Sequence, residues 1–234
     1  MRLQYKKFDV ELLKNEYIKR HYESLPFIGE EYEDSRLLLI GESHYVPKNA
    51  VPYVDIDDFY ELSYDDLEEG EYKSWINTRK VFERRVYDKC EFKGFFSNPA
   101  TEIAKIINHT ENPSKDQKIS AMHQYAFFNY FKRPSFKAGK TIENLTEKDN
   151  KFAYNTSKDI IEVLKPELII FISKKAYYAF CDSDQNNENE LKLRYTIKKV
   201  SHPSSSWWNR KRKDGGCSRQ DFYDYVSEIL MDNN

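Results

Sequence analysis

Four short apolar runs, separated by longer segments of helical pattern, constrain the fold of this chain most strongly. The runs occupy residues 36–41, 126–131, 167–173 and 195–200. Near-continuous apolar runs of this length are typical of strands that are buried on both faces of a sheet. Helices that alternate with such strands imply a mainly parallel sheet joined by right-handed crossovers. The sequence therefore predicts an α/β protein, a three-layer α/β/α sandwich with a four-stranded, mainly parallel sheet.

The segments between the apolar runs predict the helices. Apolar residues recur there at helical spacing, and Pro166 ends the segment that crosses from the second run to the third. The expected helices span residues 10–23, 75–87, 101–107, 151–164, 174–181 and 219–231. With 234 residues, the chain has the length of one sizeable α/β domain. We therefore expect a single domain, residues 1–234.

Composition bounds the class of protein. Charged residues make up 32% of the chain, and no apolar run approaches the length of a membrane span. The first residues lack the apolar core of a signal peptide. We therefore expect a cytoplasmic protein with no membrane partner. The three cysteines, Cys90, Cys181 and Cys217, are too widely spaced to suggest a disulfide framework, a metal site or an iron–sulfur cluster, and no cofactor is expected.

Charge is distributed unevenly along the chain. The net charge of −2 weighs against unspecific, tight binding of nucleic acid, which depends on neutralising phosphates. Nine acidic residues fall between positions 55 and 71, within an acidic insertion at about residues 50–74. Residues 210–213 are all basic, and a local basic face can steer DNA even when the total charge is negative. Surface decoration, a lid over the site and a protein-binding edge all remain open for the insertion.

Polar residues cluster where the predicted strands end. Glu42, Ser43, His44 and Tyr45 follow the first apolar run, and Asn129 lies near the end of the second. Ligands of open α/β sheets bind outside the carboxyl ends of the strands. The sequence therefore predicts one cleft at this edge of the sheet.

The loop that follows the fourth apolar run carries the strongest chemical signal. It places His202, Pro203, Ser204 and Ser205 directly before the basic run. Histidine is the side chain that titrates nearest neutral pH, so it can donate a hydrogen bond to a developing anion. Serine hydroxyls and loop amides are common donors to phosphate. A histidine that caps its own turn is the competing interpretation.

These motifs together resemble the uracil-DNA glycosylase superfamily. The run from Gly41 to Tyr45 resembles its first motif, and the strand carrying Asn129, with residues 132–134 after it, is similar to its asparagine strand. Residues 164–170 resemble the segment that enters its third strand, and residues 202–204 match its second catalytic motif. The resemblance covers about residues 35–230, in the order expected for the superfamily.

The resemblance implies hydrolysis of the N-glycosidic bond of a damaged or deaminated base in DNA. His202 would stabilise the departing base, and Asn129 would read its edge, although an asparagine at this place can also cap a loop. The base pocket implied by the resemblance contains Asn129, Tyr45, Phe96 and Gly41, with Phe95 as an alternative stacking residue. The implied DNA contacts are Ser204, Ser205, Trp207, Lys132, Arg133 and Arg210.

The sequence departs from the superfamily at three positions, one of which is His44, where a proline is common. Members of the superfamily have Asp, Asn or Ala at the position of Ser43, and a serine hydroxyl cannot act as a general base unaided. Either Glu42 and His44 supply the missing base, or the pocket binds without cleaving. Ser206 replaces the residue that fills the vacated base stack, commonly Leu, and Trp207 and Trp208 follow it.

Two other functions remain open. One is a binding module that keeps the pocket for a nucleotide or nucleic-acid end without cleavage, as the departures at Ser43 and Ser206 suggest. The other is an unrelated hydrolase of the Gly-Glu-x-His type, with Glu42 and His44 as acid and base. That hydrolase leaves Asn129 and the His202 loop unexplained. A Ser–His hydrolase is less well supported, because no Gly-x-Ser-x-Gly motif occurs.

Overall fold

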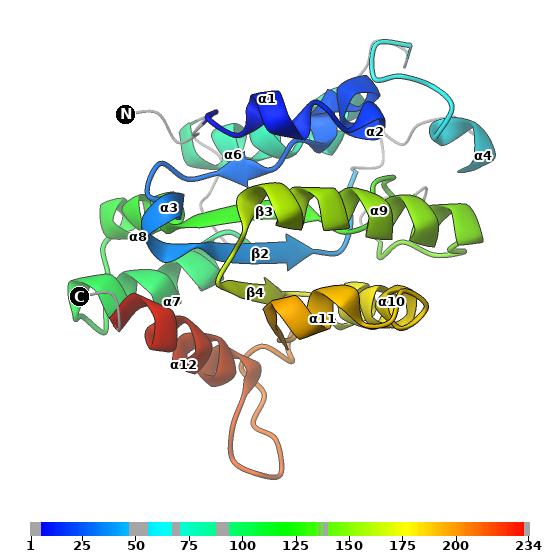
Figure 1. Ribbon diagram of the computed structural model, residues 1–234. Helices are drawn as coiled ribbons and strands as arrows, with labels where there is room; N and C mark the ends of the chain where they lie inside the picture. The colour runs from blue at the N-terminus through cyan, green and yellow to red at the C-terminus, as the bar shows by residue number, and fades with distance from the viewer. Residues whose placement is uncertain are drawn as a thin grey trace.

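A five-stranded mixed sheet lies at the centre of the protein (Figure 1). The computed structural model describes residues 6–46, 56–66, 71–87, 94–135, 137 and 140–231. The strands are β1 (Phe27–Ile28), β2 (Leu37–Gly41), β3 (Tyr125–Asn129), β4 (Leu168–Phe171) and β5 (Thr196–Lys199). Their order across the sheet is β1-β3-β2-β4-β5. Strand β1 runs antiparallel to β3, and the other neighbours are parallel.

The sheet has five strands instead of the four expected from the sequence, because β1 adds an edge strand. This strand has two residues, too few to give a periodic signal in the sequence. Both of its residues are fully buried, and its pairing with β3 is extended by a 3.0 Å hydrogen bond from the Gly29 amide to the Tyr125 carbonyl oxygen. The four strands expected from the sequence are all present, and the second, first, third and fourth lie side by side in that order.

Twelve α-helices occur among the described residues. They are α1 (Asp9–Leu12), α2 (Glu16–Arg20), α3 (Tyr32–Ser35), α4 (Ile56–Phe59), α5 (Glu71–Ile76), α6 (Thr78–Tyr87), α7 (Ser97–Asn108), α8 (Lys115–Ala121), α9 (Glu147–Leu164), α10 (Lys174–Gln185), α11 (Glu190–Arg194) and α12 (Ser218–Met231). The described residues also include 3₁₀ turns at Tyr22–Ser24 and Met122–Gln124. Part of the acidic insertion, at 50–55 and 67–70, and Cys90 lie outside the described residues.

Side-chain caps explain where the structure departs from the expected helices. The expected helix at 10–23 is divided, because the Asn15 side chain accepts a hydrogen bond from the Ile18 amide and starts α2. The expected helix at 75–87 is divided in the same way, since the Asn77 side chain accepts from the Lys80 amide at 2.9 Å. Helix α9 begins with a capping box formed by Thr146 and Asp149.

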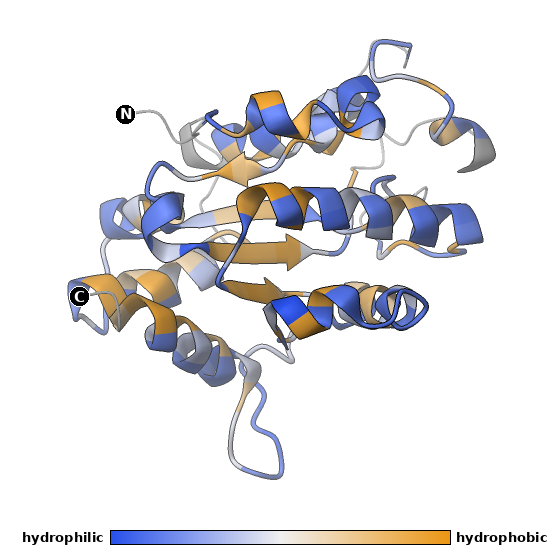
Figure 2. Ribbon diagram, viewed as in Figure 1, coloured by the Kyte–Doolittle hydropathy of each residue, from blue (hydrophilic) through white to orange (hydrophobic). Residues whose placement is uncertain are grey.

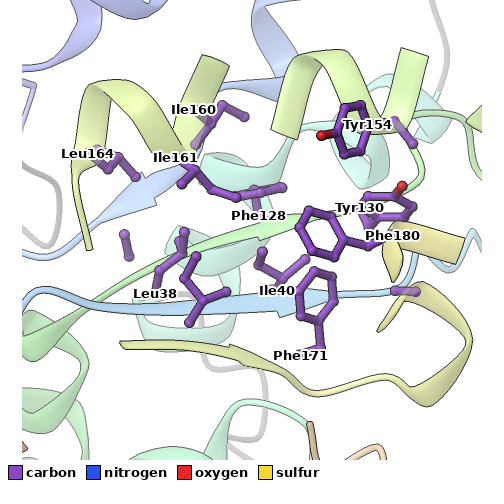
Figure 3. Packing of buried hydrophobic residues seen from close by; sticks show 14 of the residues in the cluster. Leu38, Ile40, Phe128, Tyr130, Tyr154, Ile160, Ile161, Leu164, Phe171 and Phe180 are labelled. Carbon is purple, nitrogen blue, oxygen red and sulfur yellow. The ribbon is translucent and has the colours of Figure 1, made fainter. Parts of the chain in front are cut away.

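Both faces of the sheet are covered by helices. Alternate strand residues point to opposite faces, and Figure 2 shows the strands β2 and β4 as largely apolar. On one face Leu38, Ile40, Phe128 and Phe171 pack with residues of α9 and α10, as Figure 3 shows. The residues on the other face that pack with α6, α7, α8 and α12 include Leu37, Leu39, Phe127 and Ile170. In the described part of the chain, no helix is long and apolar enough to cross a bilayer.

A buried ion pair fixes the chain after β3 to the start of α9. The Arg133 guanidinium donates to the Asp149 carboxylate at 2.7 and 2.9 Å, and both side chains are at most 1% exposed. Arg133 also donates to the carbonyl oxygens of Glu143 and Asn144. The expectation that Arg133 contacts DNA is therefore wrong, because its donors are turned inward to this network.

The Asp149 carboxylate also accepts hydrogen bonds from other groups. Tyr60 donates to it at 2.6 Å, and the Thr146 amide donates at 2.8 Å. Burial by itself raises the pKa of Asp149, but the hydrogen bonds from Arg133, Thr146 and Tyr60 outweigh burial and lower the pKa below its ordinary value. The carboxylate therefore stabilises the folded state above about pH 4, and this stabilisation is lost as the pH falls through the folded-state pKa.

Asp149→Asn leaves the Arg133 charge buried without its counter-ion. We expect a loss of about 3 to 5 kcal/mol in the free energy of unfolding at pH 7, measured by urea denaturation. The matched control is Glu147→Gln, an exposed acid in the first turn of the same helix, which we expect to change stability by less than about 1 kcal/mol. Equal effects of the two substitutions would contradict the role given to the ion pair.

Candidate functional site

A cavity of about 360 Å³ lies where the parallel strands end. Three parts of the chain form it: the residues that end or follow β2, β3 and β5, the helices α5 and α6, and the turn before α7. Its polar lining consists of Glu42, Ser43, His44, Thr78, Asn129, His202 and Ser204, and its apolar lining of Tyr45, Trp75, Val81, Phe82, Phe95, Phe96 and Phe127. The structure thus brings together the candidate residues that follow three different strands.

Gly41 and Asn129 face each other in the register of β2 and β3. A Cβ atom on Gly41 would lie 2.4 Å from the Asn129 Oδ1 and 2.8 Å from a ring carbon of Phe127. The absence of a side chain at Gly41 therefore leaves room for the Asn129 amide at the base of the cavity. No hydrogen-bond partner of this amide occurs among the described residues, so its donor and acceptor are available to a ligand.

His202 is held in one orientation by its own loop. The Ser204 amide donates to the His202 Nδ1 at 3.2 Å, which is the turn-capping role expected as an alternative. The Ser205 amide and hydroxyl both donate to the His202 carbonyl oxygen, at 2.9 and 2.7 Å. The loop is also tied to α7, because the Asn98 side chain donates to the Pro203 carbonyl oxygen at 2.7 Å.

The same contacts determine the chemical state of His202. Burial lowers its pKa, and the Glu42 carboxylate partly opposes that shift, so the ring is neutral at neutral pH. Because Nδ1 accepts a hydrogen bond, the single ring proton lies on Nε2. The ring stacks on Phe95 with centroids 5.1 Å apart, and the Tyr45 ring meets it edge-on at 6.1 Å. His202 is therefore an uncharged donor in an aromatic setting.

The Ser43 hydroxyl is buried in the lining of the cavity and has no hydrogen-bond partner in the described part of the chain. Ser43 is only 3% exposed. An unpartnered buried hydroxyl costs free energy unless a ligand or water completes its hydrogen bonds. Ser43 therefore marks a point where a bound molecule gains a polar contact.

Glu42 and His44, the two candidate bases, are engaged by separate hydroxyl groups. The Glu42 carboxylate accepts hydrogen bonds from Thr141 and, at 3.0 Å, from Ser173. The His44 Nε2 lies 3.3 Å from the Thr78 hydroxyl oxygen. Burial, together with the nearby Lys132 charge, lowers the pKa of His44 to about 3. His44 is therefore a neutral ring and a weak base.

Lys132 lies in the interior, and the expectation that it contacts DNA is wrong. Its side chain is buried, donates to the Asn129 carbonyl oxygen at 3.0 Å and lies over the Phe128 ring at 4.5 Å. Burial lowers the pKa of Lys132 to about 7. In its protonated form, Lys132 helps to lower the pKa of His44.

The loop between β5 and α12 projects from the body of the protein (Figure 1), and His202 and Ser204 at its start line the cavity. Trp207 is 56% exposed, and the Arg210 guanidinium lies 4.2 Å from its ring centroid. Trp208 is buried in the core and packs against Phe222. Within the basic run, Arg212 forms a two-point ion pair with Asp221, at 2.5 and 2.8 Å.

Helices α5 and α6 supply cavity residues that the sequence did not single out. Trp75, Thr78, Val81 and Phe82 line one wall, and the Phe82 ring stacks on Phe27 of β1 at 4.3 Å. Helical spacing predicted these helices but gave no sign of which face meets the strand ends. The pairing of Thr78 with His44 arises only from the folded arrangement.

The sequence was compared with models of protein families and with curated proteins. No family model matches the sequence. No curated protein matches it.

Gly41→Ala tests the close approach of β2 and β3. The added methyl group meets the Asn129 amide and Phe127, so we expect a loss of about 1 to 3 kcal/mol in the free energy of unfolding. Asn129→Ala removes the nearest clash, so Gly41→Ala should cost less in that background, as a double-mutant cycle by urea denaturation would show. Strictly additive effects would contradict the contact.

Proposed function

We propose that the cavity binds a nucleobase that has left its stack in DNA, and that the protein hydrolyses the N-glycosidic bond of that base. Aromatic side chains line the cavity and offer faces for stacking. The Asn129 amide offers both a donor and an acceptor to the edge of a base. The Tyr45 hydroxyl stays protonated, because burial and then Glu42 raise its pKa to about 12.

The observation that carries the proposal is the state of His202. When the bond between C1′ and the base nitrogen breaks, its electron pair stays on the base, which leaves as an anion. A neutral imidazole whose proton lies on Nε2 donates to that anion without giving up its proton. Water adds to C1′ and releases its proton to solvent.

Placement of water falls to Ser43 and Glu42 in this proposal. The Ser43 hydroxyl has an unused hydrogen bond at the cavity, and a carboxylate retains further acceptor sites when each oxygen already accepts one hydrogen bond. His44 contributes as a neutral side chain, because its pKa is about 3. Leaving-group stabilisation by His202 therefore carries more of the reaction than activation of water.

The proposal also concerns the type of α/β fold. The two helical layers and the order of the four parallel strands support an α/β/α sandwich of the uracil-DNA glycosylase type, with β1 as an added edge strand. A hydrolase of the Gly-Glu-x-His type is less well supported. Glu42 and His44 hydrogen-bond to different hydroxyl groups and do not form an acid–base pair among the described contacts.

The second candidate is a pocket that binds a base without cleaving it. It is favoured by the hydroxyl of Ser43 at the position where an acidic side chain would hold water, and by the low basicity of His44. Ser43→Asp separates the two candidates, because it adds the missing carboxylate without touching His202.

The direct test incubates the protein with oligonucleotides that carry uracil, hypoxanthine, xanthine or a mismatch, followed by alkali to reveal abasic sites. His202→Ala removes one preorganised donor, so we expect the cleavage rate to fall on the order of 100-fold with binding largely retained. The matched control is His109→Asn, at the C-cap of α7, where a left-handed backbone accepts Asn.

Two outcomes contradict hydrolysis by this mechanism. Equal cleavage by wild type and His202→Ala removes His202 from the reaction. A wild type that cleaves none of the substrates, together with a Ser43→Asp variant that does, identifies the natural protein as a binding module.

A further inference from the structure

We propose that an unpaired nucleic-acid strand runs along the carboxyl edge of the sheet, where Tyr178 and Trp207 stack on its bases and Lys199 and Arg210 contact its phosphates. The proposal names the substrate form of the proposed function and rests on it for the occupant of the cavity. The surface itself can be tested without any reaction.

Three exposed aromatic side chains lie on segments that follow parallel strands of the sheet. Among the described residues, the aromatic side chains that are more than a third exposed are Tyr22, Tyr45, Tyr178 and Trp207. Tyr45 follows β2, Tyr178 lies in the first half of α10 after β4, and Trp207 follows β5. Single exposed apolar residues are ordinary on a protein surface, but several at the same edge as a cavity indicate a binding surface.

Each of the two most exposed aromatic rings lies beside a cation. Trp207 and Tyr178 are 56% and 53% exposed. The Arg210 guanidinium lies 4.2 Å from the Trp207 centroid, and the Lys199 Nζ lies 5.1 Å from the Tyr178 centroid and 4.3 Å from that of Tyr177. Neither Lys199 nor Arg210 has an ion-pair partner in the part of the chain that the structure describes.

This pairing of aromatic ring and cation fits a single strand. Proteins bind unpaired strands with aromatic side chains that stack on successive bases and with cations that follow the phosphates. In a duplex the faces of the bases are covered by their neighbours, so exposed rings would have little to stack on. An unpaired base also enters a pocket at lower cost than a paired one.

The charge of the protein also favours a single strand over a duplex. Tight binding of duplex DNA without stacking depends on neutralising many phosphates, whereas the net charge here is −2. Arg212 is held by Asp221, and Lys132 and Arg133 are buried, so fewer cations are available for a duplex than the sequence suggests. Stacking supplies the affinity that charge alone does not.

The test measures fluorescence anisotropy with labelled oligothymidylate that carries no damaged base, and with the same strand paired to oligodeoxyadenylate. We expect the single strand to bind more tightly than the duplex. Tyr178→Ala and Trp207→Ala should each weaken single-strand binding by about tenfold, and Tyr178→Phe should retain it because the stacking face remains. Lys199→Gln should reduce the slope of log affinity against log salt by about 0.7.

Matched controls come from the rest of the surface. Tyr22→Ala removes an exposed tyrosine that packs edge-on against Tyr64, and Lys115→Gln removes an exposed lysine at the start of α8. Both should bind oligothymidylate as the wild type does. Thermal unfolding of each variant checks that the fold is retained.

The outcomes separate this surface from the proposed function. Unchanged binding by Tyr178→Ala and Trp207→Ala, or tighter binding of the duplex, overturns the single-strand surface even if bases are excised. Binding of oligothymidylate that depends on both aromatic side chains supports the surface, and the absence of any excision then counts against hydrolysis alone.

Discussion

The parallel pairing of β2 with β3 is the constraint on which the candidate site depends. It places Gly41 opposite Asn129 and brings the residues after each strand to one edge of the sheet. Strands β4 and β5 continue the same direction, so Ser173 reaches Glu42 and the His202 loop closes over the strand ends. A side chain at Gly41 would remove the space that the Asn129 amide occupies. The cavity is thus a consequence of register as much as of side-chain chemistry.

Apart from the Glu42 carboxylate, the polar groups of the site are neutral, and aromatic and aliphatic side chains surround them. Burial keeps both His202 and His44 uncharged, and the Glu42 carboxylate has hydroxyl partners on both oxygens. In the described part of the chain, the Ser43 hydroxyl and the Asn129 amide are among the lining groups that have no hydrogen-bond partner. Such a cavity favours a planar, uncharged ligand with hydrogen-bonding edges, and a neutral donor suits an anion that forms only as a bond breaks.

Much of the fold could be predicted because strands that are buried on both faces of a sheet must consist mainly of apolar residues. Strands β2, β3 and β4 are nearly continuous apolar runs, whereas β5 is a partly exposed edge strand with only one apolar residue in four. The polar residues that follow the strands were identified as site candidates because ligands of α/β sheets bind outside the carboxyl ends of the strands. Strand β1 was missed because two residues are too few to show a periodic pattern of apolar residues. Two predicted helices were too long, because Asn15 and Asn77 cap new helices within the predicted ranges.

The errors in the site have a common physical cause. Sequence shows that a residue carries charge, but not whether the fold offers it a buried partner. Arg133 was expected at the surface, yet Asp149 lies in the first turn of α9 and pairs with it in the interior. Lys132 is also buried, where it donates to the Asn129 carbonyl oxygen and lies over the Phe128 ring. The wall formed by Trp75, Thr78 and Phe82 was missed because helical spacing does not say what a helix packs against.

The state of the His202 ring tests this account most directly. Long-range ¹H–¹⁵N correlation spectra of protein labelled at histidine nitrogens distinguish the two neutral tautomers and the imidazolium, and His202→Ala identifies the resonances. The account predicts a neutral ring at pH 7, with the proton on Nε2 and an unprotonated Nδ1 that accepts from the Ser204 amide. A proton on Nδ1, or a charged ring at pH 7, would contradict it.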